Sequence, residues 1–156
     1  MGYYFRMHVI NEKDIEILSL LKEDAKLTVQ DISRKAMMPV TTVHNRIKKM
    51  EENRIIKGYS AIVDNKMLGI NISAYVMINV EYRTPSGKKI SQTKLAGEIK
   101  KNHLVDEASI VAGGTDIIIR IHAKDIDELN DFIINKLRDM DGVANTQTLV
   151  VLDEID

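Results

Sequence analysis

Residues 27–63 read LTVQDISRKAMMPVTTVHNRIKKMEENRIIKGYSAIV, and this stretch decides how the first third of the chain folds. Thr28 and Asp31 have the spacing of a capping box, which begins a helix that reaches about Ala36. Between Ile55 and Val63 the pattern changes from helical to β. We therefore predict two short helices joined by a tight turn and followed by a strand. This is the layout of a helix-turn-helix module, whose second helix lies in the DNA major groove.

The second helix of this module, predicted over residues 40–53, has one apolar stripe. Pro39 suits its start because proline has no amide hydrogen to leave unpaired. Val43, Ile47 and Met50 recur at i, i+4 and i+7 and are expected to be buried.

The rest of that helix carries groups that match DNA. Asn45 can form a bidentate pair with adenine, and Lys48 and Lys49 suit phosphates. The predicted DNA contacts are Thr41, Thr42, His44, Asn45, Arg46, Lys48 and Lys49. An isolated helix of this kind is more often a solvated polar face, but its place in the module favours DNA binding. For Arg46, beside the apolar stripe, an ion pair within the protein is an equal alternative.

A further helix is predicted over residues 12–22, with Asn11 as its N-cap and Ile15, Leu18 and Leu21 facing the core. With it, residues 1–54 form a three-helix DNA-binding domain. Residues 1–58 hold 11 Lys and Arg against 8 Asp and Glu, whereas residues 59–156 hold 11 against 15. A basic head on an acidic body suits a protein that contacts nucleic acid at one end.

Composition excludes several classes of protein. Apolar residues make up 44% of the 156 residues, enough for a core, but the apolar runs are far shorter than the roughly 20 residues of a membrane helix. The absence of cysteine excludes disulfides and thiolate sites, so a cytoplasmic location is expected. The four histidines are scattered without metal-ligand spacing. We expect no catalytic residues, no metal and no cofactor.

The second half of the chain predicts an α+β domain over residues 71–156, joined to the head by a β-strand hinge over residues 55–70. Its pattern is β-α-β twice over, which is typical of a ferredoxin-like βαββαβ sandwich. The predicted strands are 72–82, 105–111, 116–123 and 143–152, and the predicted helices are 92–101 and 125–140. Two helices cover only one side of such a sheet, so the other side predicts self-association.

Gly113 and Gly114 fit a turn between two strands. Beyond this structural role, their amides can bind the carboxylate of a small zwitterion while Asp116 accepts its ammonium.

The order of elements and several segments resemble the Lrp/AsnC, or feast/famine, transcription regulators. The resemblance covers about residues 11–152. It is carried by DIEILSLLKEDAKLT, TTVHNRIKKMEENRIIKGYSAIVD, AGGTDIIIRI and GVANTQTLVVL, in that order. Family members join a helix-turn-helix head through a hinge to a βαββαβ ligand-sensing domain. They pair through their sheets into dimers, often stacked into octamers, and sense amino acids between dimers.

The resemblance implies an effector site in the family's G-x-x-D turn and closing T-x-T strand. These correspond to Gly113, Gly114, Thr115, Asp116, Thr146 and Thr148. The chain departs from the family at Met37 and Arg54, where glycine is usual, and at Pro39, where serine is common. The leading GYYFRM segment is either an interface arm or an extension upstream of a start at Met7.

Three functions follow from these observations. The first is a homo-oligomeric, sequence-specific regulator of transcription that binds double-stranded DNA and responds to an amino-acid effector. The second is a DNA-organising protein of the same fold that needs no ligand. The third, an enzyme like the sirohaem decarboxylases that resemble this family, is disfavoured because the sequence lacks the expected histidine and arginine cluster.

Overall fold

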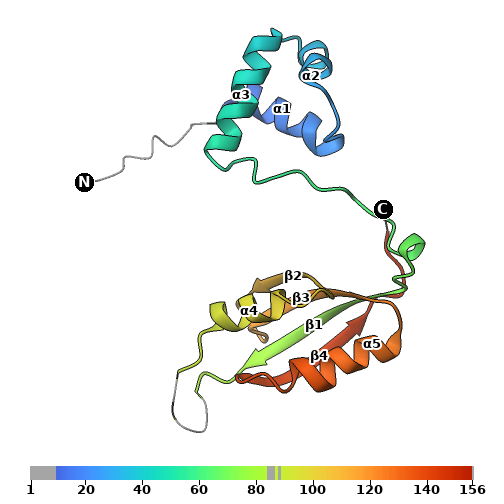
Figure 1. Cartoon of the computed structure of the whole chain (residues 1–156). Coiled ribbons are helices and arrows are strands. Elements are labelled where there is room, and N and C mark those ends of the chain that lie inside the picture. Colours follow the sequence, from blue (N-terminus) through green and yellow to red (C-terminus); the bar gives the residue numbers. More distant parts are fainter. Residues whose placement is uncertain (1–9, 84–86, 88, 156) are drawn as a thin grey trace. The chain divides into compact units, whose positions relative to one another are not determined.

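A three-helix head forms the N-terminal part of the chain. In a computed structural model, which describes residues 10–83, 87 and 89–155, the chain divides into the units Met1–Ile62 and Val63–Asp156. The head contains α1 (Glu12–Glu23), α2 (Val29–Lys35) and α3 (Val40–Glu52), as Figure 1 shows. Capping boxes begin the first two helices, with Asn11 and Asp14 at α1 and Thr28 and Asp31 at α2. Both predicted N-caps are confirmed. The GYYFRM segment lies outside the described residues.

The buried side of α1 differs from the predicted one. Leu18 and Leu21 pack against the head's core as expected, but Ile15 is 55% exposed. Ile17 and Asp14 are fully buried instead. The helix is therefore rotated so that Asp14 faces inward, where it meets a cation on α3 that the apolar spacing could not reveal.

Two residues with side chains adopt left-handed backbone conformations in the head. Met37, in the turn between α2 and α3, has φ +47°, and Arg54, after α3, has φ +55°. The tight turn at Met37 is as predicted. After α3, however, the left-handed residue is Arg54 rather than the more tolerant Asn53, whose φ is −86°. Each such conformation costs about 1–2 kcal/mol in a residue with a Cβ atom.

The predicted hinge strand over Ile55–Val63 does not form. No strand occurs there among the described residues, and the prediction of a β-strand hinge is wrong for the single chain. A strand needs a neighbour for its backbone N–H and C=O groups and for one face of its side chains. Ile62 is fully exposed and Val63 is 50% exposed, so neither is buried against a neighbouring strand. A 3₁₀ turn, Lys66–Leu68, follows in the second unit.

The second unit is a four-stranded antiparallel sheet with two helices. Its elements are β1 (Ile72–Val80), α4 (Gln92–Lys100), β2 (Val105–Ile110), β3 (Ile117–Ala123), α5 (Ile126–Asp131) and β4 (Val143–Val150). The predicted helix over 125–140 is thus α5 followed by a π-helical segment, Phe132–Leu137. The strand order β2-β3-β1-β4 confirms the predicted ferredoxin-like topology.

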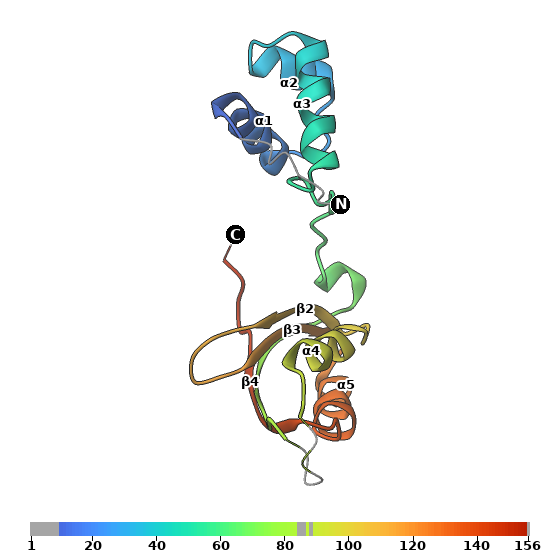
Figure 2. The same ribbon diagram turned by 90° about the vertical axis from the view of Figure 1, so that its left-hand side faces the viewer.

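The sheet of the second unit has one covered face and one open face. Figure 2 shows α4 and α5 on the same side of it. On β1, Val76 and Ile78 are fully buried towards the helices. The alternate residue Tyr75 is 40% exposed, and its strand partner Leu149 is 47% exposed. The open face therefore carries apolar side chains that remain partly exposed, with the Arg120 guanidinium 6.0 Å from the centre of the Tyr75 ring.

Candidate DNA interface and effector site

Helix α3 buries one side and exposes the other, as its sequence predicts. Val43 and Met50 are fully buried, and Ile47 is half-buried against the same core. The opposite surface exposes Thr41, His44, Asn45, Lys48 and Lys49, and Thr42 is half-buried beside them. These six predicted DNA contacts form one accessible surface. Its hydroxyl, amide, imidazole and ammonium groups can reach base edges and phosphates.

The cations of this surface are available to DNA. Lys48 Nζ lies 3.9 Å from Glu52 Oε1, and both side chains are more than half exposed. An exposed pair of this kind contributes little and is screened by salt. Phosphates can therefore displace it at small cost.

Arg46 differs from the other six predicted contacts. Its Nη1 donates to Asp14 Oδ1 at 2.7 Å and to Asn11 Oδ1 at 3.1 Å. Three quarters of its side chain are buried, and the Asp14 carboxylate has no exposed surface. The structure thus places Arg46 in an ion pair within the head, the alternative left open by the sequence.

The predicted effector turn lies between β2 and β3 and contacts β1. The Gly114 carbonyl accepts a hydrogen bond from Asn79 Nδ2 at 3.2 Å, and the Thr115 hydroxyl donates to Asn79 Oδ1 at 3.2 Å. Gly113, at φ +149°, adopts a conformation that favours glycine. Both glycines are exposed and have open space around their Cα atoms, so a ligand can approach the backbone.

The Asp116 carboxylate already has three partners inside the chain. Oδ2 accepts from the Val80 amide at 2.8 Å, while Oδ1 accepts from the Tyr82 hydroxyl and from Gln92 Nε2, each at 2.8 Å. These bonds, the Val80 amide first, hold the pKa of Asp116 below its usual 3.8. The bond to Asp116, together with the negative charge of that carboxylate, raises the pKa of Tyr82 above its usual 10.0, because ionisation would break the hydrogen bond that Tyr82 donates. A carboxylate has about four acceptor positions, so one remains for a ligand donor.

The two groups of predicted effector residues do not meet within one chain. Thr146 and Thr148 pair with Ile78 and Val76 on β1, so they share the helix-covered side of the sheet. The turn instead contacts Asn79, which points to the open side by alternation. Thr146 Oγ1 accepts a hydrogen bond from Arg138 Nε at 3.0 Å.

Sequence reasoning missed Asn79, Tyr82 and Gln92, which organise the turn from β1, from its end and from the start of α4. Strand alternation places Asn79 on the same side as Tyr75 and Met77, which was a usable signal. No local signal connects Tyr82 or Gln92 with a carboxylate more than 20 positions further along the chain.

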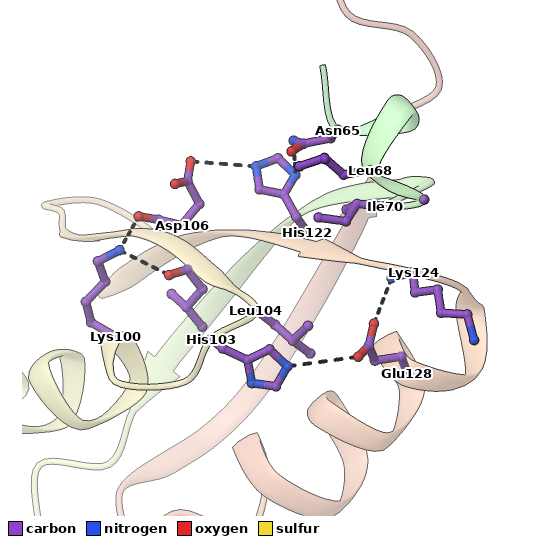
Figure 3. Close-up of a pocket in the computed structure, with 12 residues that line it drawn as sticks. Asn65, Leu68, Ile70, Lys100, His103, Leu104, Asp106, His122, Lys124 and Glu128 are labelled. Atoms are coloured by element: carbon purple, nitrogen blue, oxygen red, sulfur yellow. Dashed lines mark hydrogen bonds and ion pairs between the residues drawn. The ribbon is translucent and has the colours of Figure 1, made fainter. Parts of the chain in front are cut away.

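A cavity of about 560 Å³ lies at the other end of the same sheet, beside the 3₁₀ turn. Figure 3 shows His122 at its wall. Its Nδ1 lies 2.9 Å from Ser73 Oγ and 3.3 Å from Asn65 Nδ2, and its Nε2 lies 3.6 Å from Asp106 Oδ2. Lys100 is likewise engaged with backbone carbonyls of β2. The polar groups therefore bind one another, and His122 acts as a joint between the 3₁₀ turn and the sheet.

In residues 10–83, 87 and 89–155, no group of three or more histidine and carboxylate side chains is placed to hold a metal ion. No helix within those residues is long and apolar enough to cross a membrane.

Comparison with known proteins assigns both units. The family model for the Lrp/AsnC ligand-binding domain matches residues 73–156, and that for a winged helix-turn-helix DNA-binding domain matches residues 10–57. The chain belongs to the Lrp/AsnC family. It is 30% identical over 144 residues to the HTH-type transcriptional regulator FL11 of Pyrococcus furiosus, covering 92% of this chain and 90% of that one. It is accordingly a DNA-binding transcription regulator.

Solved structures agree with this Lrp/AsnC assignment. E. coli AsnC superposes with a TM-score of 0.78 at 25% identity, over 94% of this chain and 95% of that one. The regulator NMB0573 of Neisseria meningitidis, solved with L-Met, gives a TM-score of 0.84 at 22% identity, over 95% and 93% of the two chains. The latter likeness establishes the fold alone.

Proposed function

We propose that this regulator binds particular DNA sequences through α3, and that an amino acid bound at the turn 113–116 changes its assembly or its DNA affinity. The observation that carries the first part is the exposed polar surface of α3. Asn45 lies at its centre and lysines lie further along the helix. Such a protein acts in the cytoplasm, where the DNA is.

Self-association is part of the proposal. Tyr75 and Leu149 leave the open face of the sheet partly apolar, and Ile62 extends from an unpaired hinge. Burying these groups against a second copy favours a homodimer, which can assemble further into octamers. A dimer presents two α3 helices to a pseudo-palindromic site.

The effector proposal rests on the exposed turn. Gly113 and Gly114 offer backbone amides to a carboxylate, and Asp116 keeps one acceptor position for an ammonium. Since Thr146 and Thr148 lie on the other side of the sheet, their contribution requires a site shared between subunits. The related regulator solved with L-Met makes an amino acid the first class of ligand to test.

The DNA proposal is tested with Asn45→Ala and Lys49→Ala on a duplex selected from a random pool and on a random duplex. Asn45→Ala should lower affinity for the selected site by about 1–3 kcal/mol and leave the random duplex unaffected. Lys49→Ala should weaken both equally and reduce the salt dependence by about one counterion. Equal losses on both duplexes for Asn45→Ala would exclude base reading by that residue.

The effector proposal is tested by light scattering after size-exclusion chromatography, with each of the twenty amino acids in turn. We expect one amino acid to change the measured mass of the assembly relative to the protein without ligand. The matched variant is Gly114→Ala, whose added Cβ has no atom of the chain within 4 Å and would occupy space beside the turn where the ligand is proposed to bind. It should form the same assembly as the wild type without ligand but no longer respond to the amino acid.

A DNA-organising protein without a ligand is the second candidate, favoured by the three internal hydrogen bonds of Asp116. It predicts a constant mass with every amino acid and weak preference among DNA sequences.

A further inference from the structure

The head contains a charged group that its core does not require. Asp14 is the single fully buried polar or charged side chain among the described residues. It lies on α1, at the side that faces α3, and its cationic partner Arg46 lies 32 positions away on the reading helix. Apolar side chains, Ile17, Val43 and Met50 among them, form the core of the head around this pair.

The Asp14 carboxylate takes part both in the N-terminal cap of α1 and in the ion pair with α3. Asp14 Oδ2 accepts from the Asn11 amide at 3.1 Å, which completes the capping box of α1. Asp14 Oδ1 accepts a hydrogen bond from Arg46 Nη1, and the same Nη1 also donates to the Asn11 side chain. The start of α1 and the middle of α3 are therefore fixed to each other by directional bonds.

Stability does not explain this arrangement. The free-energy cost of removing two charges from water offsets most of the attraction between them. Well-packed apolar residues can often replace such a pair without loss of stability. Arg46 Nε is also buried without a hydrogen-bond partner in the described part of the chain. What the pair supplies, and an apolar contact does not, is a fixed rotation of α3 about its own axis.

We propose that Arg46 is a positioning residue rather than a DNA contact. Its bond to Asp14 sets the direction in which the neighbouring Asn45 meets the base edges. A reading group must be held to within about 10–20° of its working direction, and apolar packing alone allows a helix to settle in more than one rotation. The inference rests on α3 being the reading helix, as proposed above.

The informative variant is Asp14→Asn, because Asp14 is buried and cannot itself contact DNA. Binding of the full chain is measured on the selected duplex and on a random duplex, each over a range of salt concentrations. We expect the ratio of selected to random affinity to fall by roughly tenfold, as for the loss of one base contact. The affinity for random DNA and its salt dependence should stay unchanged. Arg46→Lys should behave alike, because a point charge does not reproduce the guanidinium geometry.

Two further variants complete the test. The double variant Asp14→Leu with Arg46→Met should fold, as a thermal melt checks, yet keep the lowered ratio. Should Asp14→Asn fail to fold, this pair decides alone. The matched control is Glu98→Gln, which removes the exposed Lys101–Glu98 pair of the second unit and should alter nothing.

Two results would overturn the proposal. One is a wild-type ratio in Asp14→Asn or in the folded double variant. The other is an equal loss on both duplexes for Arg46→Lys with a smaller salt slope, which would make Arg46 a phosphate contact. If the wild-type chain shows no preference among DNA sequences, the proposed function itself is contradicted. This result is obtained before any variant is made, so it is distinguishable from failure of the present proposal.

Discussion

The head (Met1–Ile62) and the unit that matches the ligand-binding domain (Val63–Asp156), called the sensing unit below, differ in where they place charged groups and left-handed backbone conformations. The head buries Asp14 completely and pairs it with Arg46, whereas the sensing unit leaves Asp116 half-buried with neutral donors. The head also places a side chain at the left-handed turn position Met37, where the sensing unit uses glycines such as Gly142. The head thus accepts strain and desolvation to fix one geometry, while the sensing unit keeps its carboxylate at the surface, where partners can change.

The largest effect expected is that of Asp14→Ala. Leaving Arg46 buried without its carboxylate should destabilise the head by about 3–5 kcal/mol. Denaturant unfolding followed by circular dichroism measures it, with the helical head and the sheet unit expected to separate into two transitions. Glu98→Ala, which breaks an exposed pair, should change stability by no more than about 0.5 kcal/mol. Similar losses in both variants would contradict the contrast between the units.

Gly142→Ala should destabilise the sensing unit by about 1–3 kcal/mol. Gly142 has φ +101°, and an added Cβ would lie 2.8 Å from Ile90 Cγ2. Gly97→Ala, in α4 with open space around it, should instead stabilise by about 0.5–1 kcal/mol. The same denaturation assay compares them, and a neutral Gly142→Ala would show that this turn tolerates side chains as the head does.

Met37→Gly should stabilise the head by up to about 1 kcal/mol, because it relieves a left-handed conformation. Greater freedom of the unfolded chain offsets part of the gain. Met37 is 91% exposed, so little packing is lost. The midpoint of thermal unfolding of Met37→Gly is compared with that of Met37→Ala. The alanine variant keeps the left-handed strain, so its midpoint should be at or below that of the wild type. A lower midpoint for the glycine variant would mean that Met37 makes a contact worth more than the strain.

The smallest effect concerns the titration of Asp116. Its folded pKa is lowered, so the stability from its hydrogen bonds is present above about pH 3.8 and is lost as pH falls below that value. In Asp116→Asn this acid-dependent loss should disappear, and the raised pKa of Tyr82 should return towards 10.0. Ultraviolet titration of tyrosinate, with Tyr82→Phe to identify the component, measures the second change. Asp125→Asn, another carboxyl with a lowered pKa, should leave that component in place.

The head was predictable wherever its signals are local. Asn11 and Thr28 were identified as caps because a cap and its partner lie three residues apart. The partner of Arg46 was not predictable, since Asp14 lies 32 positions away and helical spacing favoured Ile15 as the inward residue. The apolar stripe of α3 was predictable because its period is that of the helix itself.

In the sensing unit the topology followed from the alternation of elements, but the site did not. The donors to Asp116 come from Tyr82 and Gln92, on opposite sides of a long loop. The hinge prediction failed for a related reason. The segment around Ile62 contains residue types that are common in strands. A strand also requires a neighbouring strand to pair with, and local sequence does not show whether one is present.

The most direct test of sequence-specific DNA binding is selection of DNA from a random pool by the full chain, followed by sequencing. We expect enrichment of a pseudo-palindromic site whose half-sites are about one helical turn, or a multiple of it, apart. Recovery of no preferred sequence, with binding that depends only on salt, would contradict sequence-specific binding.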